Sequence, residues 1–431
     1  MRSSTIFSYT QSNANISSKR LRSVESGRHI AAFGGPVFFQ HLVEEKPDPV
    51  FGLVEAFKAD PKTSKINLIA GIYLDEKLQA HLMNSAKKAI EKITPQNFTA
   101  DYLPIDGLFE FHSRIGELAF GDLWQGNKER VYSAQALGGT GALQVAGQLL
   151  VQKITQKIAI SSPTWANHLG IFKRAGFEIV SYPYQCDKNK GLDLDAVLSH
   201  LNELEEKTAV LLHTVCHNPT GLDPTEEQWK ELSQMMLKKK LFPLFDFAYQ
   251  GFGQGIEPDR RALEIFFQDG HEMLVAYSCS KNFSLCRQRV GALLAISENP
   301  TAKKNVASQI KSIIRSIYSN PPGFGSAIAA EILKDEPLKK EWKQELSHMR
   351  HRLETMRKEF VKKLSSHPKG EKFKFLAEQK GMFAFTGLTK SQAEKLRQEF
   401  GVYILDTGRL SLSGLNEQNL DAAVRAILSV L

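Results

Sequence analysis

Lys281 is the first residue that the sequence singles out for chemistry. It lies in the segment 277–291, YSCSKNFSLCRQRVG, where an apolar run leads into serine and cysteine residues and then the lysine. A lysine at the end of a strand is most often solvated. A lysine that is shielded from water can instead act as an amine nucleophile and as a base. The role of Lys281 therefore depends on the polar residues that lie beside it.

Asp246 and Asn218 occupy similar positions. Asp246 lies inside the apolar segment FDFA, and Asn218 follows the apolar run TAVLLHTV in the motif HNPTGLDP. A buried carboxylate is costly unless a cation pairs with it. The partner of Asp246 is either a basic side chain in a structural salt bridge or the protonated ring nitrogen of a cofactor. Asn218 could equally belong to a plain turn, which the Pro and Gly of its motif also explain.

A glycine-rich segment, LGGTGAL (137–143), precedes an apolar helical pattern. Glycines allow the backbone N–H groups of a helix N-terminus to approach an anion closely, and Thr140 adds a hydroxyl group. The segment lacks the lysine of a P-loop and the third glycine of a dinucleotide fingerprint. It is either a turn or a cup for a single phosphate.

Trp165, Arg315 and Arg409 complete the set of candidate residues. Trp165, in PTWANH, offers a flat face, although a tryptophan is more often part of the core or of an interface. Arg315 in SIIRSIYSNPP and Arg409 in LDTGRLSLSG lie in otherwise apolar stretches. An arginine in such surroundings is suited to planar, bidentate binding of a carboxylate.

The elements that must position these residues follow from the pattern of apolar runs. The runs alternate with helical patterns and span 157–161, 177–184, 208–215, 241–248, 273–280 and 292–296. Strands that are apolar on both faces and separated by helices predict an α/β fold with a mostly parallel sheet covered by helices. Ligands of such sheets bind beyond the carboxyl ends of the strands. We therefore expect Asn218, Asp246 and Lys281 at one edge of the sheet.

Two helices are marked clearly. Asp223 as N-cap, Pro224 at the first position and Glu226 three residues after the cap predict a helix start. The segment 337–365 predicts a long, charged amphipathic helix with lysines at its C-terminal end. We expect this helix to tether a second, smaller domain. The expected division is an extension of 1–36, a large domain of 81–347, and a small domain of 48–80 and 348–431.

The composition is ordinary for a globular protein. The chain has 431 residues, enough for two domains, with 42% hydrophobic and 24% charged residues. Its longest apolar runs fall short of the roughly 18 residues that span a bilayer, so no membrane role is expected. Four cysteines without C-x-x-C spacing indicate reduced thiols and no metal site. We therefore expect a cytoplasmic protein.

Half of the net charge of +8 lies in the first 36 residues. Residues 1–36 hold five basic residues and one acid, whereas the rest of the chain holds 50 basic and 46 acidic residues. The balanced body does not favour a nucleic-acid partner. The basic, Ser-rich segment 1–36 fits an organellar transit peptide, a disordered extension, or a start site assigned too early, with the protein beginning near Val37.

In chain order, the motifs resemble those of the class I, fold-type I pyridoxal-phosphate aminotransferases. The resemblance is strongest to the branch that contains the aspartate and aromatic aminotransferases, and it extends from about residue 48 to residue 431. The motifs are INLIAGIY, YLPIDGL, LGGTGAL, PTWANH, HNPTGLDP, FDFAYQGF, SxSKNF, QRVG, RSIYSNPP, GMFAFTGL and TGRLSLSG. Each is weak alone, but their order and spacing are specific. The resemblance implies the fold of the PLP-dependent transferases, with a large domain and a smaller α/β domain.

The resemblance implies a site for pyridoxal 5'-phosphate. Lys281 would hold the cofactor covalently through its amine, and Asp246 would keep the pyridine nitrogen protonated, with His168 behind it. The other implied cofactor contacts are Tyr249 and Asn218 at the phenolic oxygen, Trp165 on the ring, Gly139, Thr140, Ser278 and Arg289 at the phosphate, and Tyr102 from the neighbouring subunit. Lys281, Asp246 and Tyr249 would be the catalytic residues.

The resemblance also implies the substrates. Arg409 would clamp the α-carboxylate, with Gly71 against it and with Trp165 and Asn218 nearby. Arg315 of the neighbouring subunit in a homodimer would bind the distal carboxylate of aspartate or glutamate, as an otherwise unpaired buried guanidinium. The implied reaction is reversible transfer of an amino group between L-aspartate or L-glutamate and 2-oxoglutarate or oxaloacetate.

Other functions are weaker alternatives. An aromatic or dual-specificity aminotransferase can keep the same distal arginine, so it is the main alternative. A lyase or decarboxylase would not need two substrate arginines. A cofactor-free binding protein would be expected to lack Lys281, Asp246 or Arg409, and all three are present.

The sequence departs from the family pattern directly after KNF. Where the family usually has Gly-Leu-Tyr, this chain has Ser284, Leu285 and Cys286. We expect neighbouring side chains to fill the space of the missing tyrosine ring. The thiol of Cys286 should then lie close to the site.

Overall fold

The computed structural model describes residues 38–93 and 99–431. The three interpretations of residues 1–36 therefore lie outside the described residues. The chain divides into a unit that ends at Lys46 and a unit of Pro47–Leu431, and all elements below belong to the second unit. None of the helices in the described ranges is long and apolar enough to cross a membrane.

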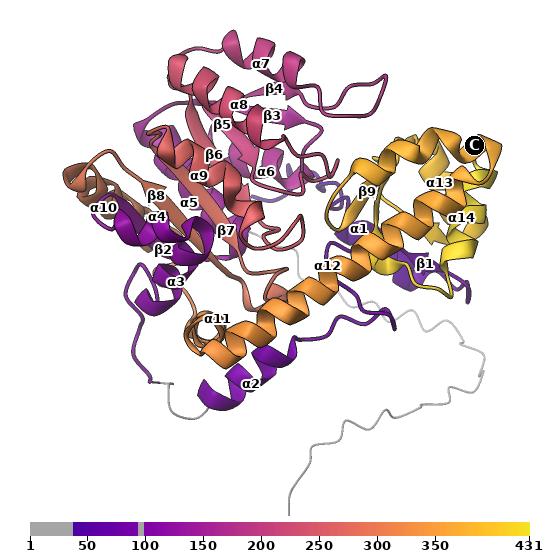
Figure 1. Ribbon diagram of the computed structural model, residues 1–431, viewed down its shortest axis with the longest axis horizontal. Coiled ribbons are helices and arrows are strands. Elements are labelled where there is room, and N and C mark those ends of the chain that lie inside the picture. The colour runs from indigo at the N-terminus through magenta and orange to yellow at the C-terminus, as the bar shows by residue number, and fades with distance from the viewer. Residues whose placement is uncertain (1–37, 94–98) are drawn as a thin grey trace, which may run out of the picture. The chain divides into compact units, whose positions relative to one another are not determined.

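In the described part of the chain, a seven-stranded sheet in the order β2-β8-β7-β6-β5-β3-β4 forms the centre of the fold (Figure 1). Its strands are β2 (Val131–Leu137), β3 (Lys157–Ser162), β4 (Glu178–Pro183), β5 (Ala209–His213), β6 (Phe242–Phe247), β7 (Met273–Ser278) and β8 (Val290–Ile296). Only β8 runs antiparallel to its neighbours, β2 and β7. The expected mostly parallel sheet is confirmed. The pattern of apolar runs did not predict β2, because its sequence VYSAQAL alternates with polar residues.

The helices of the described residues cover the sheet and continue beyond it. They are α1 (Phe51–Ala59), α2 (Asn84–Ile93), α3 (Phe109–Phe120), α4 (Asp122–Gly126), α5 (Gly138–Lys153), α6 (Ala166–Ala175), α7 (Leu194–Asn202), α8 (Glu226–Lys238), α9 (Arg261–Gln268), α10 (Pro300–Ile317), α11 (Gly323–Lys334), α12 (Glu336–Ser365), α13 (Lys390–Phe400) and α14 (Leu420–Ser429). The helix expected at 337–365 is α12.

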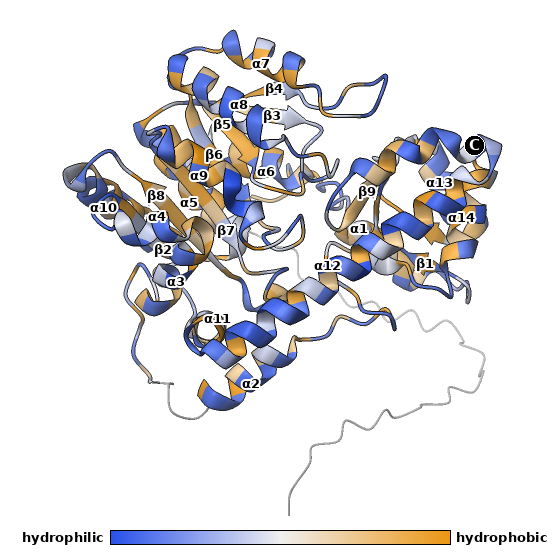
Figure 2. Cartoon of the chain, viewed as in Figure 1, coloured by the Kyte–Doolittle hydropathy of each residue, from blue (hydrophilic) through white to orange (hydrophobic). Residues whose placement is uncertain are grey.

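Alternate residues of each strand bury opposite faces of the sheet. On β5, Ala209 and Leu211 pack in the apolar cluster that includes α5, α6 and α10. Val210 and Leu212 pack in the cluster that includes α3, α8, α9, α11 and α12. Because both faces are covered, β5 is apolar on both of them. Figure 2 shows the same arrangement, with hydrophobic strands and hydrophilic residues along α10 and α12.

Two small sheets lie near the C-terminal elements. β1 (Ile66–Asn67) pairs in parallel with β10 (Val402–Tyr403), and β9 (Phe383–Phe385) pairs antiparallel with β11 (Arg409–Ser411). α12 contacts α2 and α11, and it also contacts α14 (Figure 1). A single long helix thus links the sheet-bearing region to the C-terminal elements. The division into a large domain of 81–347 and a small domain of 48–80 and 348–431 stays a prediction.

The start of α8 differs from the prediction. Its N-cap is Thr225, whose hydroxyl accepts from the backbone N–H of Gln228 in a capping box. Asp223 instead accepts from the backbone N–H groups of Cys216 and His217, at 2.9 and 3.0 Å, and so closes the loop that carries Asn218. Burial raises the pKa of Asp223 to about 6. Asp and Thr are both favourable N-caps, so the sequence could not distinguish positions two residues apart.

Trp342 anchors α12 to the segment that follows Lys281. Its buried indole Nε1 donates to the carbonyl of Asn282 at 2.7 Å, and its ring stacks on Phe283 at 4.7 Å between centroids. The long helix is therefore tied to the loop after β7 by one directional bond and one ring contact.

We expect Trp342→Phe to lower the free energy of unfolding by about 3 kcal/mol, because a buried carbonyl loses its donor and the smaller ring leaves a cavity. Urea unfolding followed by circular dichroism measures the loss. Trp229→Phe is the matched control, since Trp229 is also buried and packs on Phe245 and Phe266. The control should lose about 1 kcal/mol less, because its change is one of packing alone. Equal losses would contradict the role given to the indole hydrogen bond.

Candidate active site

Five strands place candidate residues at one edge of the sheet. β2, β3, β5, β6 and β7 run in the same direction, because β8 reverses between β2 and β7. Gly139 follows β2, Trp165 follows β3, Asn218 follows β5, Asp246 is the penultimate residue of β6, and Lys281 follows β7. These residues are far apart in sequence and share the carboxyl edge of the sheet.

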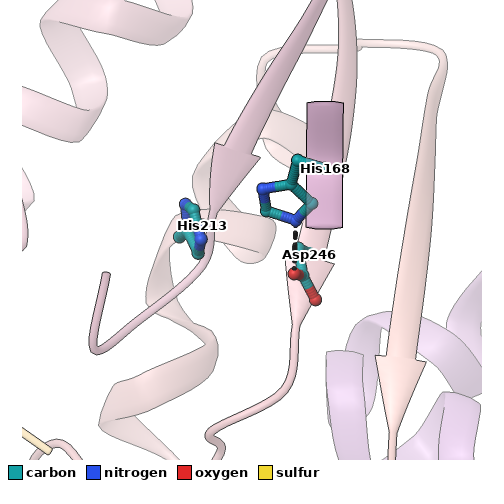
Figure 3. A group of neighbouring side chains, drawn as sticks. All are labelled: His168, His213 and Asp246. Atoms are coloured by element: carbon teal, nitrogen blue, oxygen red, sulfur yellow. Dashed lines mark hydrogen bonds and ion pairs between the residues drawn. The ribbon is translucent and has the colours of Figure 1, made fainter. Parts of the chain in front are cut away.

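Asp246 is buried on β6 and is paired with His168 of α6 (Figure 3). His168 Nε2 lies 3.0 Å from Asp246 Oδ2, and His168 Nδ1 lies 2.8 Å from the hydroxyl of Thr164. Burial alone would raise the pKa of Asp246, but the hydrogen bond and charge of His168, with a smaller contribution from Lys281, outweigh it. The pKa of Asp246 therefore lies below its usual value. Figure 3 shows the second carboxylate oxygen directed away from His168.

His213 lies beside this pair on β5. Its two ring nitrogens are buried and have no hydrogen-bond partner among the described residues. Burial lowers the pKa of His213 to about 3, so the ring is neutral at ordinary pH. Ligand atoms of His168, His213 and Asp246 all lie within 4.8 Å of one another. Because both nitrogens of His168 already take part in hydrogen bonds, we interpret the group as support for Asp246.

Arg409 on β11 brings a second buried charge to the same place. It is 5% exposed, and its guanidinium donates to Asn218 Oδ1 at 3.1 Å and to the carbonyl of Ile69 at 3.2 Å. Its Nε has no partner among the described residues, and the group lies 4.1 Å from the ring centroid of Phe383. Burial lowers the pKa of Arg409 to about 10, so it stays protonated at neutral pH. A buried guanidinium with a free donor is suited to bind a carboxylate.

Asn218 connects Arg409 to Tyr249. Its Nδ2 donates to the Tyr249 hydroxyl at 3.4 Å, while its Oδ1 accepts from Arg409. Burial raises the pKa of Tyr249, and the charges of Lys281 and Arg409 partly oppose that rise. Gly71 follows Ile69 by two residues, and a Cβ at Gly71 would meet no atom within 4 Å. The space beside Gly71 is open.

Lys281 is half-buried, and its Nζ lies 5.2 Å from the ring centroid of Tyr249. A chain of hydrogen bonds supports this pair. Asn282 Nδ2 donates to the Tyr277 hydroxyl at 2.8 Å, which donates to Gln250 Oε1 at 2.7 Å. The residues that follow Lys281 and Tyr249 in the chain are thus held together by buried polar contacts.

The glycine-rich segment forms the N-terminus of α5, which begins at Gly138. A Cβ on Gly139 would lie 3.0 Å from Cβ of Ser278, so a larger residue would crowd this close approach of α5 to β7. Arg289, in the left-handed region with φ of 52°, donates to the carbonyls of Cys286 and Leu137 beside it. Thr140 is half-buried one residue after Gly139. Backbone N–H groups, a serine hydroxyl and a guanidinium together make a cradle for an anion.

Tyr102 and Arg315 are not brought into this group of side chains. Tyr102 is 89% exposed, and Arg315 is exposed on α10, where its guanidinium donates to the hydroxyl of Ser319. The expectation that Arg315 serves the site of a neighbouring subunit stays a prediction. Arg315 faces outward from α10, since its apolar neighbours Ile313 and Ile314 point into the core.

The segment that departs from the family pattern has a special backbone. Ser284 has a φ of 54°, a conformation that favours glycine. The thiol of Cys286 donates to the carbonyl of Ser280 at 2.8 Å, and burial raises the pKa of this thiol. Cys286 is therefore a protonated side chain that is hydrogen-bonded to Ser280, two residues after Ser278 of the cradle.

Sequence reasoning missed three residues of the site. The Ser280 hydroxyl accepts a hydrogen bond from Ser278 Oγ at 3.1 Å beside the cradle, and the SxSK spacing could have indicated it. Phe383 lies against Arg409, and His213 lies beside Asp246. Phe383 carries no polar signal in the sequence, and His213 resembles any other residue of an apolar run.

The fold and the site define an α/β enzyme of the pyridoxal-phosphate-dependent, fold-type I class, as the motifs predicted. The chain matches the model of the family Aminotransferase class I and II over residues 63–427, and it belongs to this family.

Relatives and solved structures agree with this membership. The chain is 42% identical to an aspartate aminotransferase of Escherichia coli over 398 residues, which cover 91% of this chain and 100% of the relative. It is 39% identical to an aromatic-amino-acid aminotransferase of Escherichia coli, with the same shares of 91% and 100%. A crystal structure of the aromatic-amino-acid aminotransferase of Burkholderia pseudomallei, covalently bound to pyridoxal phosphate, has a TM-score of 0.88 and 40% identity and covers 92% of this chain and 100% of that chain.

We expect His168→Phe to lower the free energy of unfolding at pH 7 by about 3 kcal/mol, because it leaves a buried carboxylate unpaired. The double variant His168→Phe/Asp246→Asn should recover part of that loss, since the charge is gone as well. The loss in His168→Phe should shrink as the pH falls from 7 to 4, because burial without a partner raises the pKa of Asp246 in the folded variant, which then takes up a proton. Urea unfolding of the two single variants and the double variant at pH 4 and 7 measures these differences. Additive losses would contradict the pairing.

Proposed function

We propose that this chain transfers amino groups between acidic amino acids and 2-oxo acids. L-Aspartate and L-glutamate are the amino donors, and 2-oxoglutarate and oxaloacetate are the acceptors. The observation that carries the proposal is the buried guanidinium of Arg409, which keeps a free Nε beside the edge where Asp246 and Lys281 lie. The identity to an aspartate aminotransferase supports the choice of acidic substrates.

The residues present fit pyridoxal phosphate. The cradle at Gly139 and Ser278 suits a phosphate, and Arg289 beside it supplies the positive charge. The free oxygen of Asp246 suits a protonated ring nitrogen, and Trp165 offers a flat face next to His168. When bound, the cofactor supplies an electron-accepting ring that stabilises negative charge at the substrate Cα.

Different side chains of this protein bind different groups of the substrate and the cofactor. Arg409 holds the α-carboxylate through its free donor, and Asn218 fixes the orientation of that guanidinium from the other side. Asp246 keeps a proton on the ring nitrogen, since its depressed pKa favours the charged form that attracts a cation. Tyr249 and Asn218 present a hydroxyl and an amide from the same corner.

Lys281 moves the proton at the reacting carbon. Its amine would hold the cofactor covalently, and when free it would be the base that takes the Cα proton of the substrate and returns it. The half-buried position of Lys281 over the Tyr249 ring limits its contact with water. The hydrogen bonds from Asn282 to Tyr277 and from Tyr277 to Gln250 hold together the segments that carry Lys281 and Tyr249.

A second copy of the chain completes the site in this proposal. Tyr102 and Arg315 are exposed and are separate from the other candidate residues, as expected for groups that serve a neighbouring subunit. Tyr102 would add a hydroxyl to the phosphate cradle, and Arg315 would pair with the distal carboxylate of the substrate. We further propose a cytoplasmic location, with an organelle as the alternative if residues 1–36 are a transit peptide.

An aromatic or dual-specificity aminotransferase is the second candidate. The identities to the aspartate and aromatic relatives differ by only a few per cent, and the solved structure compared above is an aromatic enzyme. The two functions differ in the pocket for the substrate side chain, which binds a carboxylate in one case and an aromatic ring in the other.

We expect Lys281→Ala to lose transamination by about 10³-fold or more, because the base and covalent anchor are absent, while the cradle and Asp246 still bind cofactor. Borohydride reduction followed by peptide mass mapping should place the cofactor mass on the peptide with Lys281 in the wild type and nowhere in the variant. Lys230→Ala, a surface lysine paired with Glu226, is the control and should behave as the wild type. Substantial turnover by Lys281→Ala would refute the assignment.

We expect the wild type to have a higher kcat/KM for aspartate than for phenylalanine. Arg315→Leu should lower the kcat/KM for aspartate by about 100-fold, because the distal carboxylate loses its partner. Activity toward phenylalanine should change little. Arg174→Leu, an exposed arginine at the end of α6, is the control. If Arg315→Leu keeps the aspartate activity, the role of this arginine is wrong.

Mixing Lys281→Ala with Arg315→Leu, both of which should be impaired toward aspartate, tests the shared site directly. A dimer of one Lys281→Ala chain and one Arg315→Leu chain has one intact site if Arg315 serves the neighbouring subunit. Co-refolding equal amounts should therefore restore about a quarter of the wild-type aspartate activity. No recovery would place Arg315 in the site of its own chain.

A further inference from the structure

Arg357 is a buried arginine that the proposed reaction leaves without a role. It lies on α12, is 5% exposed, and directs its guanidinium to three backbone carbonyls. Its Nη2 donates to Gly381 and Phe383 at 2.9 and 2.8 Å, and its Nη1 donates to Leu376 at 3.4 Å. One side chain of the long helix thus holds the strand β9 and the bend before it.

Burying the charged guanidinium of Arg357 costs free energy, so stability alone does not account for it. Burial lowers the pKa of Arg357 to about 10, so the group is charged in the core at neutral pH. Its recorded hydrogen bonds go to neutral carbonyls rather than to a carboxylate. Apolar residues of similar volume often replace buried charges without loss of stability. The rigid fork of donors does what an apolar side chain cannot, since it fixes the direction of three carbonyls.

The backbone that Arg357 holds belongs to β9, which pairs with the strand of Arg409 and carries the ring against which Arg409 packs. β9 pairs with β11 so that Phe383 is opposite Ser411 and Phe385 is opposite Arg409. The ring of Phe383 lies 4.1 Å from the Arg409 guanidinium, and it also meets Tyr249 edge-on at 6.1 Å. A shift of β9 would therefore move the aromatic surface on which Arg409 rests.

The same backbone also borders the loop that carries Asn218. The N–H of Lys380 donates to the carbonyl of Gly221 at 2.7 Å. A Cβ on Gly381, whose φ is 80°, would lie 2.7 Å from Cβ of Cys216, so this bend packs tightly on the loop. Arg357 therefore fixes a segment that supports both Arg409 and its partner Asn218.

We infer that Arg357 is a positioning residue for carboxylate recognition, which holds Phe383 and the 380–383 backbone so that the free Nε of Arg409 keeps its direction. The inference deepens the proposed function and rests on Arg409 as the group that binds the α-carboxylate. Arg357 does not touch the substrate. Its loss should weaken the binding of carboxylates and leave the proton transfer at Lys281 largely intact.

The test measures binding and turnover of the holoenzyme separately. Calorimetric titration with succinate, which carries carboxylates and no reactive amine, gives a Kd, and steady-state assays give KM and kcat for aspartate. Arg357→Met should raise the Kd and the KM by about 10-fold and change kcat by less than about 3-fold, because the lost interaction is one of binding. Arg357→Lys keeps the charge without the fork and should raise both by about 3-fold.

The control is Arg130→Met. Arg130 also donates to a backbone carbonyl, that of Ser297, and also packs on a phenylalanine ring, that of Phe267, but it lies at the opposite end of β2 from the cradle. It should leave Kd, KM and kcat at wild-type values. Wild-type binding in Arg357→Met, or in Arg357→Lys if the first variant does not fold, would overturn the inference. A fall in kcat with unchanged KM would overturn it as well.

A parallel Arg409→Met variant separates this inference from the proposed function. If Arg409→Met binds succinate as the wild type does, the carboxylate site itself is misplaced and the proposed function fails with it. If Arg409→Met loses succinate binding while the Arg357 variants keep it, only the positioning role fails.

Discussion

The candidate active site depends on keeping a carboxylate ionised inside a hydrophobic sheet. Asp246 lies between Phe245 and Phe247 on β6, both fully buried. A carboxyl group in such surroundings takes up a proton unless another group compensates its charge. His168 supplies that compensation from the first turn of α6, at 3.0 Å. The charge of Asp246 therefore depends on the packing of α6 on the sheet, because this packing places His168 beside the carboxylate.

Two buried arginines near the C-terminal strands use their guanidinium groups differently. The hydrogen bonds of Arg357 go to three backbone carbonyls, and it acts within the protein. Arg409 is held by Asn218 and Ile69 and keeps Nε free for an incoming carboxylate. Phe383 lies between them, with its carbonyl on Arg357 and its ring on Arg409. Rigid support on one side of the ring thus gives the binding group on the other side a fixed direction.

Much of the fold and part of the site could be predicted from local patterns. The apolar runs predicted β3 to β8, and the long amphipathic pattern predicted α12, because burial on one or both faces leaves a periodic signal in the chain. The direction of parallel strands predicted that Asn218, Asp246 and Lys281 share an edge. The pattern did not predict β2, whose polar residues pack under α3 and α10. It also placed the cap of α8 on Asp223, which the fold uses to close the loop of Asn218.

The sequence by itself determined the residue types that carry chemistry, the order of the strands along the chain, and the family to which the motifs belong. Only the tertiary structure decided which of these residues meet. It showed that Arg409 is buried on Asn218 whereas Arg315 is exposed on α10, although both lie in apolar stretches of sequence. It also placed Arg357 and Phe383 beneath Arg409. The physical reason is that burial and hydrogen-bond partners arise from segments hundreds of residues apart, and no local pattern records the distance between them.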